Sequence, residues 1–270
     1  MGVGSGQLIL SIIYKMTECN KITSLGLEVG YKRRYILRLK SHRSESSPQG
    51  EPAMKIVLTG ATGFAGGEVL RQALADPDIG QVTVLTRRDP GMTHPKLRTV
   101  VLDDFEHYAG LDLGDHAACI WCLGVSQAQV GKDAYVRITL DYALAAARAM
   151  RAYNPLMRFC FVSGRSADPT EQRAALYAKI KGRTERRLGE LDGPLFVFRP
   201  GYIRPTARSG PRKDLARLLA PIGSLLSLFS ADYSIDCDQL AYCLLDVAKY
   251  GADHGLLTNG ELRAWKTGRA

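Results

Sequence analysis

The chain has 270 residues, of which 46% are hydrophobic and 23% are charged, and its formal net charge is +9 at pH 7. These proportions are those of a globular protein with one sizeable core. The positive charge permits contact with nucleic acid. However, no zinc-finger spacing, RNA-binding aromatic signature or long lysine run accompanies it, so nucleic-acid binding is not predicted.

Six cysteines are scattered along the chain, and no secretory segment indicates an oxidising compartment. They are therefore predicted to be free thiols. Cys119 and Cys122 have C-x-x-C spacing, but they lie in an apolar, strand-like run in which positions three apart point to opposite faces. Neither a disulfide nor a metal site is predicted.

Residues 1–53 differ from the rest, with a short apolar run over 8–13 and a polar tract over 41–52. The apolar run is too short for a membrane span and has no basic segment in front of it. Our preferred hypothesis is a disordered or artefactual N-terminal extension, followed by a folded domain over 54–270 in a cytoplasmic protein. An amphipathic organelle-targeting peptide is the alternative, which the glutamates of this segment oppose.

From Met54 onward, apolar runs alternate with helical patterns. The predicted strands are 54–59, 81–86, 97–102, 117–123, 157–163 and 194–199, and the predicted helices are 64–76, 133–152, 170–191, 212–229 and 237–250. This alternation indicates an α/β fold with a doubly wound parallel sheet, the Rossmann fold, and a small C-terminal helical region.

The first predicted strand runs directly into glycines spaced G-x-x-G-x-x-G, and a helical pattern follows. Such a turn brings backbone N–H groups and the positive end of a helix dipole to a diphosphate. A purely structural glycine turn is the alternative. The candidate cofactor-binding residues here are Gly60, Thr62, Gly63, Phe64, Ala65 and Gly66.

The second predicted strand ends in Arg87 and Arg88. At this place an NAD-preferring fold offers a carboxylate to the ribose, whereas a guanidinium suits a 2′-phosphate. We therefore predict NADP(H) as cofactor, with NAD(H) as the second choice because Asp89 is close by. A solvated arginine pair is the alternative.

Two further strand ends carry candidate cofactor contacts. Asp104 follows the third strand, where its carboxylate could accept a hydrogen bond from the adenine amino group or cap a turn. Gly124 follows the fourth strand, where a small residue lets the chain pass near the ribose and diphosphate. An ordinary glycine turn would look the same.

The main catalytic signal is the Y-x-x-x-K pair Tyr177 and Lys181 on a predicted helix, where this spacing puts both side chains on one face. An ammonium beside a phenol is expected to lower the pKa of the tyrosine, as a general acid/base near neutral pH requires. Ser163, after the fifth strand, could polarise the same carbonyl, and Ser166 competes for that role. Tyr177 could also be a packing residue with Lys181 solvated.

Pro200 and Gly201 follow the sixth strand. Proline fixes the backbone and glycine allows close approach, which suits a wall for the nicotinamide carboxamide. A turn that only ends the strand is the alternative.

Together these motifs resemble the atypical members of the short-chain dehydrogenase/reductase superfamily, and more narrowly its Tat-interacting-protein branch. The resemblance rests on G-A-T-G-F-A-G-G from Gly60, V-V-L-D-D-F-E over 100–106, C-L-G over 122–124, Y-x-x-x-K-G over 177–182 and F-R-P-G over 198–201. It implies pyrophosphate binding by the three spaced glycines, 2′-phosphate binding by Arg87 and Arg88, and adenine binding by Asp104. It also implies a catalytic set of Ser163, Tyr177 and Lys181, in which Lys181 also holds the nicotinamide ribose.

The sequence thus predicts an NADP(H)-dependent oxidoreductase that acts on a carbonyl or alcohol of unknown identity, as a monomer or homodimer without a membrane span. Two alternatives stay open. One is an NADPH-binding regulatory or assembly protein with little turnover. The other is a nucleotide-sugar epimerase or dehydratase, which the short region after Pro200 weakens.

Overall fold

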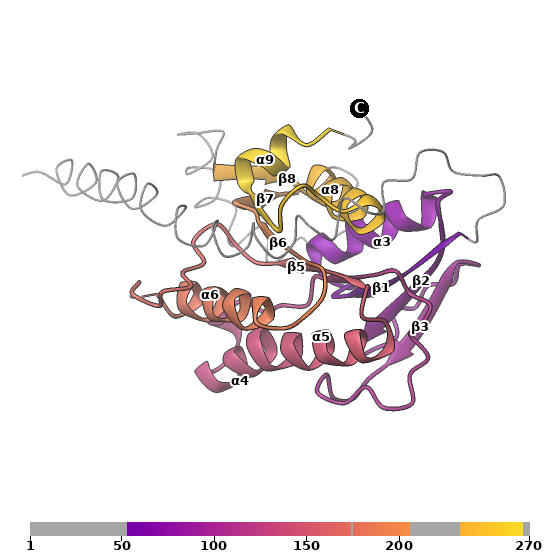
Figure 1. The fold of residues 1–270 in the computed structure, drawn as a ribbon, viewed down its shortest axis with the longest axis horizontal. Coiled ribbons are helices and arrows are strands. Elements are labelled where there is room, and N and C mark those ends of the chain that lie inside the picture. The colour runs from indigo at the N-terminus through magenta and orange to yellow at the C-terminus, as the bar shows by residue number, and fades with distance from the viewer. Residues whose placement is uncertain (1–52, 174, 206–232, 267–270) are drawn as a thin grey trace, which may run out of the picture. The chain divides into compact units, whose positions relative to one another are not determined.

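The structure is a computed structural model that describes residues 53–173, 175–205 and 233–266. The predicted N-terminal extension, except for Ala53, and the predicted helix over 212–229 lie outside these ranges. Figure 1 shows the described elements in colour.

A seven-stranded sheet forms the centre of the domain, with the strand order β3-β2-β1-β4-β5-β6-β9 and parallel pairing throughout. The strand order reverses between β1 and β4, which is the switch point at which ligands bind in doubly wound sheets. The predicted fold class is confirmed. The strands are β1 (Met54–Thr59), β2 (Ile79–Thr86), β3 (Leu97–Val101), β4 (Ala118–Trp121), β5 (Arg158–Val162), β6 (Leu195–Arg199) and β9 (Leu256–Thr258).

The central strands are apolar on both faces because helices cover both sides of the sheet. Ile56, Val57 and Leu58 of β1 and all four residues of β4 are buried. Continuous apolar runs of this kind are typical of parallel strands.

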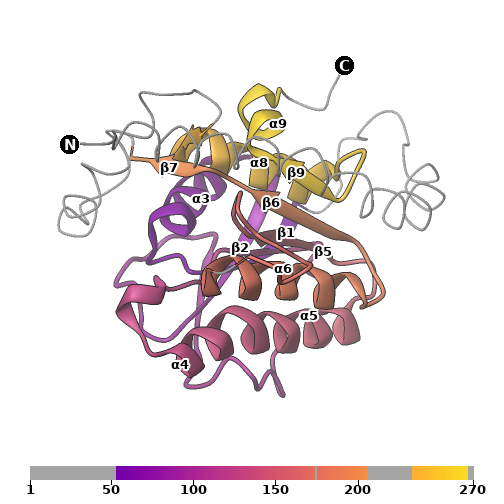
Figure 2. The ribbon, with the colours of Figure 1, turned by 90° about the vertical axis from the view of Figure 1, so that its left-hand side faces the viewer.

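Two helix layers enclose the sheet (Figures 1 and 2). α3 (Phe64–Ala75) and α8 (Cys237–Tyr250) pack against each other on one face. α5 (Tyr142–Tyr153) and α6 (Leu176–Gly189) pack against each other on the other face.

The helix predicted over 133–152 is one continuous helical segment of three parts. α4 (Lys132–Val136) leads into the π-helical turn η2 (Arg137–Asp141), and α5 follows directly. The π turn lies against α6, where the Thr184 hydroxyl bonds to the carbonyl oxygens of Thr139 at 3.4 Å and Ile180 at 2.7 Å.

α6 begins at Leu176, six residues later than the predicted start at 170. The cause is Asp168, whose buried carboxylate accepts hydrogen bonds from the N–H groups of Thr170, at 3.0 Å, and Arg173, at 2.7 Å. Glu171 has a positive φ of 59°, which is incompatible with a helix. The residues before Leu176 therefore form an Asp168-centred loop.

The region after β6 contains elements that sequence periodicity did not predict. β7 (Tyr202–Arg204) and β8 (Ser234–Asp236) form a separate two-stranded parallel sheet, and α9 (Asn259–Ala264) follows β9. A short turn, η1 (Gln127–Gln129), also follows β4. In the described ranges, no helix has the length and apolarity that crossing a membrane requires.

The five cysteines that the structure describes, Cys119, Cys122, Cys160, Cys237 and Cys243, are free thiols, as the sequence predicts.

Candidate active site

The glycine turn between β1 and α3 is packed too tightly for side chains. Gly60 has a φ of +70°, and a Cβ atom there would lie 2.5 Å from the carbonyl oxygen of Cys122. A Cβ atom on Gly66 would collide with the carbonyl oxygen of Gly60. The start of α3 therefore rests directly on the turn, and the turn rests on the end of β4.

The first turn of α3 suits an anionic group. Its N-cap, Gly63, makes no side-chain capping bond, and the first turn contains no acidic side chain. The N–H groups of a first helical turn have no partner within the helix and point along its axis. This backbone cradle fits a dinucleotide diphosphate, with Phe64, Ala65 and Gly66 at the helix end and Thr62 exposed beside it.

The end of β4 is held beside the cradle. Thr59, the last residue of β1, accepts a hydrogen bond at its Oγ1 from the N–H of Leu123 at 3.2 Å. Gly124 is exposed, and a Cβ atom there would meet nothing within 4 Å. The protein's own packing therefore does not require glycine at position 124.

Arg87 and Arg88 are exposed at the end of β2. Within the described residues neither guanidinium forms an ion pair, and the Thr86 hydroxyl fixes the turn by donating to the carbonyl of Arg88 at 2.8 Å. The nearby Asp89 accepts a hydrogen bond from the N–H of Gly91 at 2.9 Å. The two cations are thus free to meet an anion, whereas the competing carboxylate is engaged in a local turn.

Asp104 lies after β3 and is bonded within the protein. Its carboxylate accepts from the N–H of Glu106 at 3.1 Å and bonds to the His107 ring at 3.0 Å and to Arg137 at 3.5 Å. These contacts match the turn that the sequence left open as an alternative. They reduce the capacity of Asp104 to bind adenine.

Tyr177, Lys181 and Glu185 follow one another at four-residue spacing along one face of α6. The Tyr177 hydroxyl lies so close to Gly164, after β5, that any side chain at position 164 would occupy its place. The N–H of Tyr177 also donates to the side chain of Gln127, in the loop after β4, at 3.2 Å. The loops after β4 and β5 therefore both contact the start of α6.

Lys181 is held between the helix and the sheet. Its ammonium donates to the carbonyl oxygen of Val162 at 2.9 Å and lies 4.8 Å from the ring centre of Phe161. Burial lowers the pKa of Lys181 to about 8, although Glu185 and Cys122 act in the opposite direction. The amine is therefore predominantly protonated at pH 7 and neutral well above pH 8.

The pKa of Tyr177 differs from the sequence-based expectation. Burial raises it to about 12, and Tyr135 and Glu185 add to the increase. The expectation that Lys181 would lower this pKa was wrong for the protein by itself, because the loss of hydration around the phenol dominates. Tyr177 is a neutral phenol throughout the physiological pH range.

Ser163 belongs to a buried polar network. Its hydroxyl donates to Glu185, and the same carboxylate pairs with Arg199, whose Nε lies 3.0 Å and 3.2 Å from the two carboxylate oxygens. Ser163 and Glu185 are both buried. The hydroxyl proton of Ser163 is thus directed at Glu185 in this arrangement, whereas the half-buried Ser166 has no hydrogen bond to its hydroxyl among the described residues.

Glu185 and Arg199 were not among the sequence candidates. Two signals point to them in the sequence. Glu185 follows Lys181 at the same four-residue spacing as Lys181 follows Tyr177, and Arg199 is the last residue of β6. The sequence does not indicate that the two side chains pair.

The Pro200–Gly201 turn is fixed from two sides. The carbonyl of Pro200 accepts from the N–H of Arg165 at 2.9 Å, and the N–H of Gly201 donates to the Asn259 side chain at 2.7 Å. A Cβ atom on Gly201 would collide with the carbonyl oxygen of Tyr233. The turn therefore joins the loop after β5 to the region around β8 and α9.

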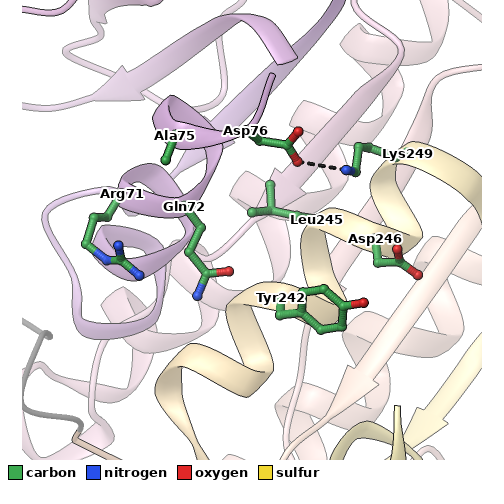
Figure 3. Close-up of a pocket in the computed structure, with 8 residues that line it drawn as sticks. All are labelled: Arg71, Gln72, Ala75, Asp76, Tyr242, Leu245, Asp246 and Lys249. Atoms are coloured by element: carbon green, nitrogen blue, oxygen red, sulfur yellow. Dashed lines mark hydrogen bonds and ion pairs between the residues drawn. The ribbon is translucent and has the colours of Figure 1, made fainter. Parts of the chain in front are cut away.

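A separate cavity of about 260 Å³ lies between α3 and α8 (Figure 3). It is lined by the C-terminal half of α3, whereas the glycine cradle is at the helix's N-terminus. Its charged groups already have partners: Arg71 pairs with Glu68, and Lys249 pairs with Asp76 at 2.7 Å. The cavity shares no residue with the candidate active site.

Comparison with known proteins gives a consistent result. No family model matches the chain. Protein HTATIP2 of Rattus norvegicus is 29% identical over 198 residues, which span 71% of this chain and 79% of that protein. Protein FMP52, mitochondrial, of Candida albicans is 26% identical over 223 residues, which span 78% of this chain and 92% of that protein.

Solved structures agree on the fold. Gre2 from Candida albicans in complex with NADPH has a TM-score of 0.59 at 15% identity, with 76% of this chain and 78% of that chain covered. WbmF from Bordetella bronchiseptica in complex with NAD+ also has a TM-score of 0.59, at 13% identity, covering 78% of this chain and 77% of that chain. An oxidoreductase of the short-chain dehydrogenase/reductase family from Burkholderia thailandensis has the same fold, with a TM-score of 0.58 at 16% identity, covering 78% of this chain and 93% of that chain. This chain therefore shares the fold of these structures, and its sequence is similar to HTATIP2.

The fold implied by the resemblance is thereby confirmed. In this fold, the predicted site residues lie on the loops at the carboxyl ends of β1 to β6 and at the start of α6. That edge of the sheet contains the switch point, where a nicotinamide cofactor is expected to bind.

Proposed function

We propose that this chain is an NADP(H)-dependent oxidoreductase that reduces a carbonyl compound, with Tyr177 as the general acid. The observation that carries the proposal is that Tyr177 and Lys181 lie on one face of α6, at the same edge of the sheet as the glycine cradle. The proposed cofactor contacts are Gly60, Thr62, Gly63, Phe64, Ala65, Gly66, Arg87, Arg88, Asp104, Gly124, Lys181, Pro200 and Gly201.

The bound nicotinamide would supply the hydride for the reaction. Tyr177 would donate its phenolic proton to the substrate oxygen as negative charge develops there. The neutral phenol, with its pKa raised to about 12 by burial, suits the acid of a reduction better than the base of an oxidation. Lys181 would supply a positive charge near that oxygen and reach the nicotinamide ribose.

Ser163 remains the proposed substrate-orienting hydroxyl, with Ser166 as its competitor. For Ser163 to donate to a substrate oxygen, its proton must leave Glu185. Glu185 would keep its hydrogen bonds from Nε and Nη2 of Arg199 during that exchange, so the carboxylate would not be left without a partner.

A second candidate function is an NADPH-binding regulatory or assembly protein with little turnover. It is favoured by the hydrogen bond from Ser163 to Glu185, which directs the hydroxyl away from substrate. The two candidates separate on one measurement: a panel of aldehydes and ketones with NADPH gives turnover in the first case and none in the second, although NADPH binds in both.

The cofactor proposal is tested by calorimetric titration of the full chain with NADPH and NADH. We expect NADPH to bind more tightly. We also expect the double variant Arg87→Gln and Arg88→Gln to bind NADPH about tenfold or more weakly. Its affinity for NADH should be nearly unchanged, because only NADPH has the 2′-phosphate. Arg148→Gln, which removes an exposed charge from α5, is the matched control. Equal losses for both cofactors would refute the assignment of the arginine pair.

The cellular location is part of the proposal. The sequence predicts the cytoplasm, whereas the FMP52 relatives carry the word mitochondrial in their names, which supports the organelle alternative. Fractionation of cells that express the full chain, with N-terminal sequencing of the recovered protein, separates the two. Sedimentation of the same sample distinguishes a monomer from a homodimer.

A further inference from the structure

The loop after β5 carries an arginine that the proposed reaction does not use. Arg165 follows Gly164, the residue against which the Tyr177 hydroxyl lies. Its own N–H is bonded to the carbonyl of Pro200, so the backbone at this point is fixed. The backbone of Arg165 is therefore anchored beside Gly164, the residue that the hydroxyl of the proposed proton donor contacts.

The side chain of Arg165 crosses to the region before β8. Its guanidinium carbon lies 3.7 Å from the centre of the Tyr233 ring, which is the distance of face-to-face stacking. Stacking uses the face of the guanidinium and leaves the N–H groups at its edge free to donate in the plane. The ring thus orients the cation without satisfying its hydrogen bonds.

Two other arginines of this region have carboxylate partners. Arg199 forms its ion pair with Glu185, and Arg204 of β7 pairs with Asp236 at 2.9 Å. Arg165 has no carboxylate partner among the described residues, and it is half-buried. The hydroxyl of Ser166, the next residue, also lacks a hydrogen bond within the described part of the chain, so two consecutive residues carry donors without an acceptor there.

We propose that Arg165, stacked on Tyr233 and helped by Ser166, binds a carboxylate on the substrate, so that the enzyme prefers anionic carbonyl compounds. This inference rests on the proposed reductase function. A planar guanidinium with free in-plane N–H groups matches the two oxygens of a carboxylate. Each of the two charge-assisted hydrogen bonds is about twice as strong as a hydrogen bond between neutral groups.

The test compares two aldehydes that differ in one charge, 4-carboxybenzaldehyde and methyl 4-formylbenzoate, as substrates of the full chain with NADPH. We expect a higher kcat/KM for the acid. Arg165→Gln should lower the value for the acid by about tenfold or more and change the value for the ester by less than about twofold. Arg165→Lys should retain part of the preference, and Arg148→Gln should leave both values unchanged.

A binding measurement keeps this test separate from the reductase proposal. Phenylglyoxal modifies accessible arginines, and mass spectrometry of the digested protein locates the modified positions. We expect benzoate to protect Arg165 and not Arg148. Protection of Arg165 without turnover of either aldehyde would support the anion site and count against the reductase.

Equal turnover of acid and ester without protection of Arg165 would overturn the anion site and leave the reductase in place. Loss of folding is controlled by thermal melting of each variant. Tyr233→Leu supplies a second variant that keeps the charge but removes the stacking ring, and it should weaken benzoate protection. If Tyr233→Leu lowers the melting temperature without changing protection, the stacked pair only joins the loop to the β8 region.

Discussion

The glycine turn after β1 and the loop after β5 lie at the same edge of the sheet, but they are built differently. The turn is formed by backbone alone, because Gly60, Gly63 and Gly66 pack so closely that side chains would collide with carbonyl oxygens. The loop after β5 is held by side chains, through Ser163, Glu185 and Arg199 in one network and Asp168 in another. The glycine spacing of the turn is visible in the local sequence, whereas the network of Ser163, Glu185 and Arg199 joins residues of three separate segments.

This difference has a consequence for mutation. A backbone cradle tolerates no added atom at its contact points, whereas a side-chain network can lose one bond and still hold the chain. Substitutions in the turn should therefore lower cofactor affinity and stability together. Substitutions in the network should be able to change stability or the reaction rate one without the other.

The largest effect is expected for Tyr177→Phe, which removes the proton donor but keeps the ring against Gly164. The value of kcat should fall by about 10²- to 10⁴-fold, the range of general acid catalysis. NADPH affinity should stay within about twofold, because the phenol is outside the diphosphate cradle. Single-turnover kinetics with calorimetric titration measures both. Undiminished turnover would remove Tyr177 from the mechanism.

The next effect concerns the backbone cradle. Gly66→Ala places a methyl group against the carbonyl of Gly60, which is backbone and cannot rotate away. Overpacking of this kind costs about 1–3 kcal/mol, so both NADPH affinity and melting temperature should fall. Gly131→Ala is the matched control, because a Cβ atom there meets nothing within 4 Å. If both variants behave like the natural protein, the cradle is looser than its packing implies.

The same contrast explains what the sequence predicted. The β1–turn–α3 unit was found within a residue, because an apolar run, spaced glycines and a helical period are all local signals. The start of α6 was placed six residues early, because the Asp168 hydrogen bonds that delay it are not visible as a pattern. Asp168 delays the helix because its carboxylate is buried and aimed at backbone N–H groups, and the spacing of residues in the sequence shows neither property.

Long-range contacts account for the other misses. The pairing of Glu185 with Arg199 joins α6 to the end of β6, and the sequence has no local signal for it. The pKa of Tyr177 was predicted with the wrong sign because burial raises it to about 12, and Tyr135 and Glu185 act in the same direction. α9 is an exception, because its signal is local: Thr258 and Glu261 form a capping box at its start.

Glu185→Gln tests whether the network influences the chemistry. The carboxylate of Glu185 raises the pKa of Lys181, which burial has lowered to about 8. Without that negative charge the ammonium should lose its proton at a lower pH. The alkaline limb of the kcat/KM profile should then move down by about one pH unit. Glu190→Gln, the same change at an exposed position after α6, should not move it.

The smallest effect should distinguish the two serines. Ser163→Ala removes one hydrogen bond to the charged Glu185, whose bonds to Arg199 persist, so the cost to stability should be about 1.5–3 kcal/mol. If Ser163 also orients the substrate, kcat/KM falls by up to about tenfold, since one neutral hydrogen bond is lost.

Ser166→Ala should then change kcat/KM for the neutral ester by less than about twofold and leave the melting temperature unchanged. The reverse pattern, with Ser163→Ala less stable but fully active and Ser166→Ala impaired, would assign Ser163 to the scaffold and Ser166 to the substrate. The side-chain network after β5 would then serve only to hold the loop in place.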